Sequence, residues 1–261
     1  MYSKTRVNMK IGIISGHIID SFVSSGEEIK VETLYGNVLL WHTKRGGKDV
    51  FFLNRHGEKG NLPPHRINYR GIIHAFKASN VDCILSLATV GSLKPSIEPG
   101  DIVIPNDFID FTKNRCYTFY DDQRIHVDLS EPFCPSLRDK INEVCGRMKQ
   151  RCHAKGTYLA TEGPRLETPA EIMMFSKFAD VVGMTVVPEV ILAREKEICY
   201  ASLCLVCNMA AGLQSSLSAD EIVKVVTKKK PLLTDLLNNI IEGIVEGRSC
   251  TCRNSLEKAR L

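Results

Sequence analysis

The sequence lacks the features of a membrane, secreted or nucleic-acid-binding protein. Its 261 residues contain no run of about 18 consecutive apolar residues, which a membrane-spanning helix needs. The first nine residues lack the apolar core of a signal peptide. The formal charge is only +4, and lysines and arginines are spread along the chain rather than gathered in a basic stripe. We therefore expect a cytoplasmic protein with no membrane or nucleic-acid partner.

The ten cysteines also lack a recognisable metal-binding pattern. No pair has the spacing of a zinc finger or zinc ribbon, so we expect no metal site. Cys83, Cys199, Cys204 and Cys207 fall in apolar runs, where a thiol behaves as a small hydrophobe. Most of the cysteines are therefore interpreted as core residues.

Linkers, internal repeats and low-complexity tracts are absent as well. A chain of this length suits one large α/β domain, since such domains commonly run to about 200–250 residues. We predict a single domain over residues 1–261, with a core at 9–246 and a loose tail at 247–261. Residues 135–148 and the segment from Leu232 onward place apolar side chains on one helical face, as helices that cover a sheet do.

The segment from Lys155 to Gly212 carries the strongest local signals. Its first part reads as a strand that turns at Gly163-Pro164. Thr168-Pro169-Ala170-Glu171 then predicts a capping box with proline at the first helical position. The strand should therefore deliver Glu162, Arg165 and Glu167 to the carboxyl end of a sheet, where open α/β sheets bind their ligands.

Two more strands follow in the same segment. Residues 181–184 form a short apolar run that ends at Met184-Thr185, and a helix is expected from Val187 onward. Residues 199–207 are almost continuously apolar, as in a strand buried on both faces, and this run ends at Asn208. Three strand ends thus place Glu167, Met184-Thr185 and Asn208 in one crevice.

Further polar groups follow predicted strands near the amino terminus. Residues 9–14 read as a strand that leaves through Ser15-Gly16-His17, and residues 38–43 and 49–53 as a hairpin. The hairpin ends in Asn54-Arg55-His56-Gly57. A fixed guanidinium beside an imidazole suits a dianion, because arginine offers forked donors and histidine adds another.

Together these segments resemble one family, the purine nucleoside phosphorylases, in its branch with the methylthioadenosine and methylthioinosine phosphorylases. The matching stretches occur in one order across residues 9–246: NRHG, INYR, VGSL, PGD, EGPRLETPAE, DVVGMTVVPE and NMAAG. The resemblance implies a three-layer α/β sandwich around a mixed, twisted sheet. It also implies phosphorolysis, in which phosphate attacks C1′ of a purine nucleoside and releases the base and a ribose 1-phosphate. Inorganic phosphate is then a co-substrate, and no cofactor is needed.

The family pattern assigns a phosphate site, although the sequence departs from it in places. The implied phosphate-binding residues are Ser15, His17, Arg55, His56, Thr89 and Thr185. His17 stands where relatives carry a hydroxyl, Ile18 where they carry glycine, and Ala88 where a polar group is common. A histidine can still donate a hydrogen bond to phosphate.

The nucleoside site follows from the same resemblance. Catalysis is assigned to Asn208, Glu167 and His56. The implied substrate contacts are Met184 at the ribose, Glu167, Asn208, Met209 and Ala210 around the base, Ala219 at the 5′ end, and His126 from a neighbouring subunit.

Glu167 and Asn208 favour a 6-oxopurine. An ionised Glu167 can accept from N1–H, while the Asn208 amide pairs with O6 and N7. Adenosine-type relatives carry serine at the first position and aspartate at Asn208 and Ala210. Ala219 offers no donor to a 5′-hydroxyl, which favours a 5′-methylthio group. S-methyl-5′-thioinosine is therefore the expected substrate, in purine salvage.

Several alternatives stay open. They are a methylthioadenosine phosphorylase, a general inosine/guanosine phosphorylase, a nucleosidase that uses water, and a non-catalytic nucleoside-binding protein. The resemblance implies a homotrimer or a dimer of trimers. Cys250-Thr251-Cys252 looks like a pair found in some thermophilic relatives, and whether it forms a disulfide is left open.

Overall fold

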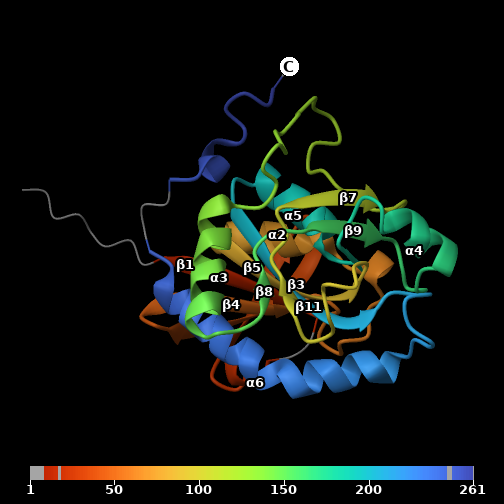
Figure 1. Cartoon of the computed structure of the whole chain (residues 1–261). Coiled ribbons are helices and arrows are strands. Elements are labelled where there is room, and N and C mark those ends of the chain that lie inside the picture. Colours follow the sequence, from red (N-terminus) through yellow and green to blue (C-terminus); the bar gives the residue numbers. More distant parts are fainter. Residues whose placement is uncertain (1–8, 17–18, 246–248, 261) are drawn as a thin grey trace, which may run out of the picture.

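A mixed β-sheet lies at the centre of the molecule (Figure 1). The computed structural model describes residues 9–16, 19–245 and 249–260, and in these ranges the sheet has eleven strands. Its main path runs β2-β3-β4-β1-β5-β10-β9-β7, with β11 paired to β5 and β6, and β8 paired to β6. The strands are β1 (Lys10–Ser15), β2 (Glu27–Thr33), β3 (Gly36–Arg45), β4 (Lys48–Asn54), β5 (Cys83–Ser92), β6 (Ile102–Val103), β7 (Asp107–Phe111), β8 (Cys152–His153), β9 (Thr157–Thr161), β10 (Val181–Gly183) and β11 (Cys199–Met209).

Helices cover both faces of this sheet. They are α1 (Asp20–Val23), α2 (Tyr69–Ala78), α3 (Pro135–Arg147), α4 (Pro169–Phe175), α5 (Val186–Glu195) and α6 (Ala219–Gly243), with 3-10 turns η1 (Pro64–Arg66) and η2 (Thr251–Asn254). One apolar core joins α3 and α6 to the sheet, and a second joins α2 and α5 to its opposite face. The prediction of a three-layer α/β sandwich around a mixed sheet is confirmed.

Parallel pairing gathers several strand ends at one edge. β1 lies parallel to both β4 and β5, and β11 runs parallel to β5 along ten pairs of residues. β10 pairs antiparallel with the far end of β5 and parallel with β9. The carboxyl ends of β1, β4 and β11 therefore meet beside the end of β10.

The predicted loose tail is wrong for residues 249–260. Cys252 and Ala259 are buried, and Ser255 donates a 2.6 Å hydrogen bond to the Arg194 carbonyl at the end of α5. The amide of His126 donates to the Ala259 carbonyl at 2.7 Å, and Ile125 forms a β-bridge with Arg260. This C-terminal segment packs on the body of the protein. Among the helices described, none is long and apolar enough to span a membrane.

The start of α4 has the predicted capping box. The Thr168 hydroxyl accepts from the Glu171 amide at 3.2 Å, and the Glu171 carboxylate accepts from the Thr168 amide at 2.8 Å. Arg165 pairs with the same carboxylate at 2.7 Å. The cap therefore fixes the backbone directly after Glu167.

We predict that Thr168→Ala lowers the free energy of unfolding by about 1 kcal/mol, because it removes an N-cap acceptor. Chemical denaturation measures the loss. Thr168→Ser keeps the hydroxyl and is the matched control. Equal losses in both variants would contradict the capping role.

Candidate active site

A cavity of about 360 Å³ opens at the edge where the strand ends meet. Its size falls in the usual range for small-molecule sites, about 300–1,000 Å³. The wall includes Gly16 after β1, the Arg55-His56 pair after β4, Thr89 in β5, Met184-Thr185 after β10 and Asn208 in β11. Glu167 joins them from the turn before α4. The structure thus brings together residues that lie far apart in the sequence.

Asn208 reaches the cavity at an irregularity in β11. Pairing with β5 shifts between Val206, opposite Val90, and Asn208, opposite Gly91, so Cys207 is left over. Such bulges re-aim side chains and are common beside active sites. The Asn208 side-chain amide donates to the Met209 carbonyl at 2.9 Å. Because a carbonyl only accepts, this bond fixes the amide orientation and leaves Oδ1 and one N–H for a ligand.

Glu167 has one oxygen held by the protein. The Thr161 hydroxyl at the end of β9 donates to Oε1 at 2.5 Å. Glu167 is half-buried on the cavity wall, so its other oxygen is available as an acceptor. The predicted partners of Glu167 on the same strand exit have other roles. Glu162 accepts from the Lys113 amide and pairs with Arg115, and Arg165 pairs with Glu171.

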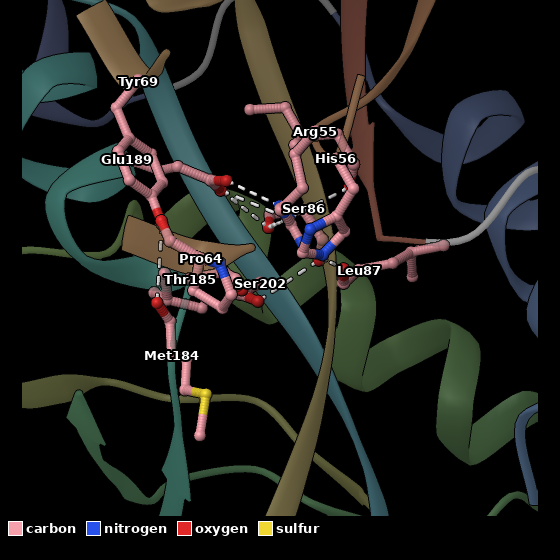
Figure 2. A network of polar contacts seen from close by, with 12 residues as sticks. Arg55, His56, Pro64, Tyr69, Ser86, Leu87, Met184, Thr185, Glu189 and Ser202 are labelled. Carbon is pink, nitrogen blue, oxygen red and sulfur yellow. Dashed lines mark hydrogen bonds and ion pairs between the residues drawn. The ribbon is translucent and has the colours of Figure 1, made fainter. Parts of the chain in front are cut away.

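Arg55 belongs to a buried polar network (Figure 2). Its Nε donates to Glu189 Oε1 at 2.7 Å, its Nη1 to the Leu87 carbonyl at 2.8 Å, and its Nη2 to Ser86 Oγ at 2.7 Å. Tyr200 and Ser86 donate to the other Glu189 oxygen at 2.7 and 3.1 Å. The guanidinium therefore has its position fixed before any ligand binds.

The charges in this network support each other. Burial alone would lower the pKa of Arg55, but the adjacent Glu189 carboxylate reverses this and leaves that pKa raised. Burial, and then the Glu189 charge, raise the pKa of Tyr200 well above its usual value. Arg55 thus stays cationic and Tyr200 stays a neutral donor. One of the two Nη1 hydrogens has no acceptor among the described residues. It is available to an anion, because Arg55 also lies on the cavity wall.

His56 is held by its Nδ1 atom, which lies 2.6 Å from the Leu62 carbonyl. Since that carbonyl only accepts, Nδ1 carries a hydrogen and the neutral ring presents Nε2 as an acceptor. A Cβ placed on Gly16 would lie only 3.3 Å from Nε2, so this atom faces the turn after β1. Burial lowers the pKa of His56, and the Arg55 charge lowers it further against the opposing effect of the Leu62 bond.

Other predicted site residues lie elsewhere. Ser15 is buried but lines a smaller cavity on the α6 side, with Val226 and Leu233. His17 and Ile18 lie outside the described residues. Ala88 is buried beside Thr89 on the same α6-side cavity.

The predicted 5′ wall is also corrected. Ala219 is exposed in the first turn of α6, and its neighbour Val223 is 56% exposed. Leu217 and Ile222 line the cavity instead. Ser218 accepts from the Glu221 amide as the helix N-cap, which turns Ala219 outward. Ala210 lines the cavity, whereas Met209 does not.

Arg115 is a buried residue that sequence reasoning missed. Its side chain is 1% exposed although it lies in the polar loop after β7. It donates to the carbonyls of Met184 and Val187 at 2.6 Å each, and to that of Glu162 at 2.8 Å. Arg115 therefore ties the ends of β9 and β10 together behind the cavity.

His126 lies outside the cavity of its own chain. It is exposed, and its amide is bonded to the C-terminal segment. Its role toward a neighbouring subunit stays a prediction.

Comparison with known proteins agrees with this geometry. Residues 11–242 match the family model described as "Phosphorylase superfamily". A probable 6-oxopurine nucleoside phosphorylase of Dictyoglomus turgidum is 48% identical over 97% of this chain and 98% of its own length. A probable S-methyl-5′-thioinosine phosphorylase of Methanopyrus kandleri is 47% identical over 88% of this chain and 91% of its own length.

Solved structures give the same result. A methylthioadenosine phosphorylase from an antarctic soil metagenomic library superposes with a TM-score of 0.90 at 32% identity, covering 97% of this chain and 93% of its own. The methylthioadenosine phosphorylase of Schistosoma mansoni gives a TM-score of 0.91 at 25% identity over 97% of this chain and 99% of its own. The chain belongs to the phosphorylase superfamily. It is an enzyme of the purine nucleoside phosphorylase type.

We predict that Glu189→Ala lowers the free energy of unfolding by about 3–5 kcal/mol, because it leaves the Arg55 charge buried without its partner. Arg70→Ala is the control: it breaks the Arg70–Asp121 pair, in which Asp121 is 72% exposed, and should cost at most about 1 kcal/mol. Urea denaturation compares the two variants. Similar losses would show that Glu189 does not support Arg55.

Proposed function

We propose that the protein catalyses phosphorolysis of 6-oxopurine nucleosides in purine salvage, with S-methyl-5′-thioinosine as the preferred substrate. The proposal rests on one observation: the same cavity contains two sets of polar groups, one suited to phosphate and one suited to a purine. Arg55, His56, Thr89 and Thr185 supply cationic or hydrogen-bonding groups for phosphate, and Glu167 with Asn208 supplies groups for a purine. Phosphate is a co-substrate, and the proposed reaction uses no metal or organic cofactor.

The phosphate end is built to hold a dianion under C1′. The Arg55 guanidinium is fixed by Glu189 and Ser86, so no side-chain ordering is required when phosphate binds. Bond cleavage gives the sugar positive charge, which a dianion placed below it stabilises. Met184, whose carbonyl is held by Arg115, lines the same cavity and is proposed to face the ribose.

The base end distinguishes hypoxanthine from adenine. In our proposal the free oxygen of Glu167 accepts a hydrogen bond from N1–H, and the free N–H of Asn208 donates to O6. Asn208 Oδ1 accepts a hydrogen bond from N7 once N7 is protonated. Adenine has a lone pair at N1 and an amino group at position 6, so both contacts would be mismatched. Sites that leave their own polar groups unpaired can discriminate by a factor of about 10⁴.

The apolar wall favours the methylthio group. Leu217 and Ile222 contribute only hydrocarbon to the cavity, together with Pro64 and Leu166. These side chains offer no hydrogen-bond partner to a 5′-hydroxyl, whereas a methylthio group needs none and can pack against them. This substrate choice is supported by the relatives, which include a probable 6-oxopurine nucleoside phosphorylase and a probable S-methyl-5′-thioinosine phosphorylase.

We also propose that the chain assembles as a homotrimer or a dimer of trimers. Large apolar side chains are exposed around α4 and the edge strand β7: Phe111 (46%), Met173 (67%), Met174 (45%) and Phe178 (68%). Apolar surface gathered at one place on a protein often marks a subunit interface.

The decisive assay measures cleavage of S-methyl-5′-thioinosine, inosine and methylthioadenosine with and without phosphate. We predict phosphate-dependent cleavage, with kcat/KM for methylthioinosine above that for inosine and above that for methylthioadenosine by up to about 10⁴. Cleavage by water alone would indicate a nucleosidase. No cleavage of any of the three would indicate a binding protein.

Asn208→Asp tests the base contact directly. An aspartate accepts from the 6-amino group of adenine, so the preference for methylthioinosine over methylthioadenosine should fall. Asn239→Asp makes the same chemical change on α6, outside the cavity, and should leave the ratio unchanged. A wild type that prefers the adenine compound would overturn the substrate assignment.

His56 gives a test by pH that does not depend on turnover. Because the pKa of His56 is lowered, its ring is neutral at any pH above about 6.5, the usual pKa of histidine. Because the unfolded chain binds this proton more readily, His56 makes the phosphate-free protein less stable as the pH falls through that value. A bound phosphate favours the imidazolium, so phosphate should raise the pKa of His56. NMR titration of the ring signals, with and without phosphate, measures the shift.

His56→Asn assigns the signal and serves as the control for this titration. The asparagine nitrogen can keep the bond to Leu62, while the Nε2 position is lost. Phosphate affinity should then fall, and the part of its pH dependence that comes from protonation of His56 should disappear. An unchanged His56 pKa in saturating phosphate would exclude contact with the anion.

A further inference from the structure

Four cysteines from distant parts of the chain come together at the end of the sheet opposite the cavity. Cys134 precedes α3, Cys199 begins β11, and Cys250 and Cys252 lie at η2 in the C-terminal segment. All four Sγ atoms lie within 4.8 Å of one another, and Cys199 and Cys250 are 3.4 Å apart. Three of them are buried and Cys250 is half-buried. All ten cysteines of the chain are free thiols.

The spacing of the sulfurs matches one small ion. Zinc binds four thiolates tetrahedrally with Zn–S distances of about 2.3 Å, which places the sulfurs about 3.8 Å apart. A site closed by four cysteines leaves no open position for a substrate or water, as is usual for structural zinc. Iron–sulfur clusters hold several metal atoms and need sulfurs farther apart.

The surroundings suit the negative charge of such a centre. Four thiolates and one Zn²⁺ carry a net charge of −2. The charge of Arg194 acts on Cys252, and that of Arg138 interacts with Cys134. Each of these arginines has a buried Nε with no partner among the described residues. The positive charges of these arginines would partly offset the negative charge of a zinc–thiolate centre.

We propose that Cys134, Cys199, Cys250 and Cys252 form a structural zinc site that fastens the C-terminal segment to the sheet. The site is not catalytic, because Asn208 lies nine positions after Cys199 along β11, roughly 30 Å at about 3.3 Å per residue. Its effect extends to the loop after β7, since the fastened segment bonds to Ile125 and His126. This proposal does not depend on the substrate.

The test is metal analysis of the full-length protein, purified under reducing conditions without chelator. We expect one zinc ion per chain by mass spectrometry of the metal content. Cobalt substitution should give the absorption of a tetrahedral cobalt–thiolate centre. Cys252→Ala and Cys199→Ala should each lose the metal. Cys145→Ala, a buried cysteine of α3 outside the cluster, should retain it.

Two results would overturn the proposal. One is reduced wild-type protein that takes up neither zinc nor cobalt. The other is native protein in which these four cysteines resist alkylation until a reductant is added, which would show disulfides in place of a metal site. Hydrogen exchange gives a second readout: removing zinc should raise exchange at the His126 amide, which is bonded to Ala259. Cys252→Ala changes no strand residue, and alanine keeps a small apolar side chain at this position of the core beneath α3 and α6.

Discussion

The buried ion pair between Arg55 and Glu189 is the interaction on which the cavity depends. Arg55 follows β4 and Glu189 lies in α5, so the pair joins the sheet to the helical layer behind it. A charge in this apolar core would be very unfavourable alone, and here each is surrounded by hydrogen-bonding partners. Packing in the core therefore fixes the position of the Arg55 guanidinium, and this places a cation on the wall of the cavity before any ligand binds.

Arg115 plays a comparable part on the other side of the cavity. Its guanidinium binds backbone carbonyls at the ends of two strands, so it positions main chain rather than ligand. Because Met184 is one of the residues it holds, a loop that looks like ordinary polar surface controls part of the wall. The Phe119 amide anchors the same loop to Glu195 of α5 at 2.7 Å.

Much of this architecture follows from the sequence because its signals are local. The capping box at Thr168, the apolar run of β11 and the hairpin of β3 and β4 each specify an element within a few residues. Glu167, Thr185 and Asn208 could be placed in one crevice because each stands at or just after the end of a predicted strand. In the structure β10 runs antiparallel to β5 and β11, so it is pairing beside the carboxyl end of β5, rather than a shared strand direction, that brings Thr185 to Asn208. What could not be predicted depends on long-range packing. The partner of Arg55 is 134 residues away, and Arg115 gives no sign of burial in its own segment.

The remaining errors have related causes. Ala219 was assigned to the cavity by alignment with relatives, but the Ser218 cap sets the phase of α6 so that Leu217 and Ile222 face inward. The C-terminal segment was predicted to be loose, but its contacts are with residues far earlier in the chain, such as the Ser255 bond to the carbonyl of Arg194, 61 residues away. Spacing rules find metal sites made from one segment. They do not find groups of cysteines that the fold brings together from distant segments, such as Cys134, Cys199, Cys250 and Cys252.

The long pairing between β5 and β11 has a consequence for synthesis of the protein. β5 is in the first half of the chain, and one of its edges stays open until β11 has been made and aligned with it. Until then a growing chain exposes an apolar strand edge, the kind of surface that pairs with other chains. Asn208 is also the last cavity-lining strand residue to leave the ribosome. The nascent polypeptide is therefore inactive, and at risk of aggregation, through most of its translation.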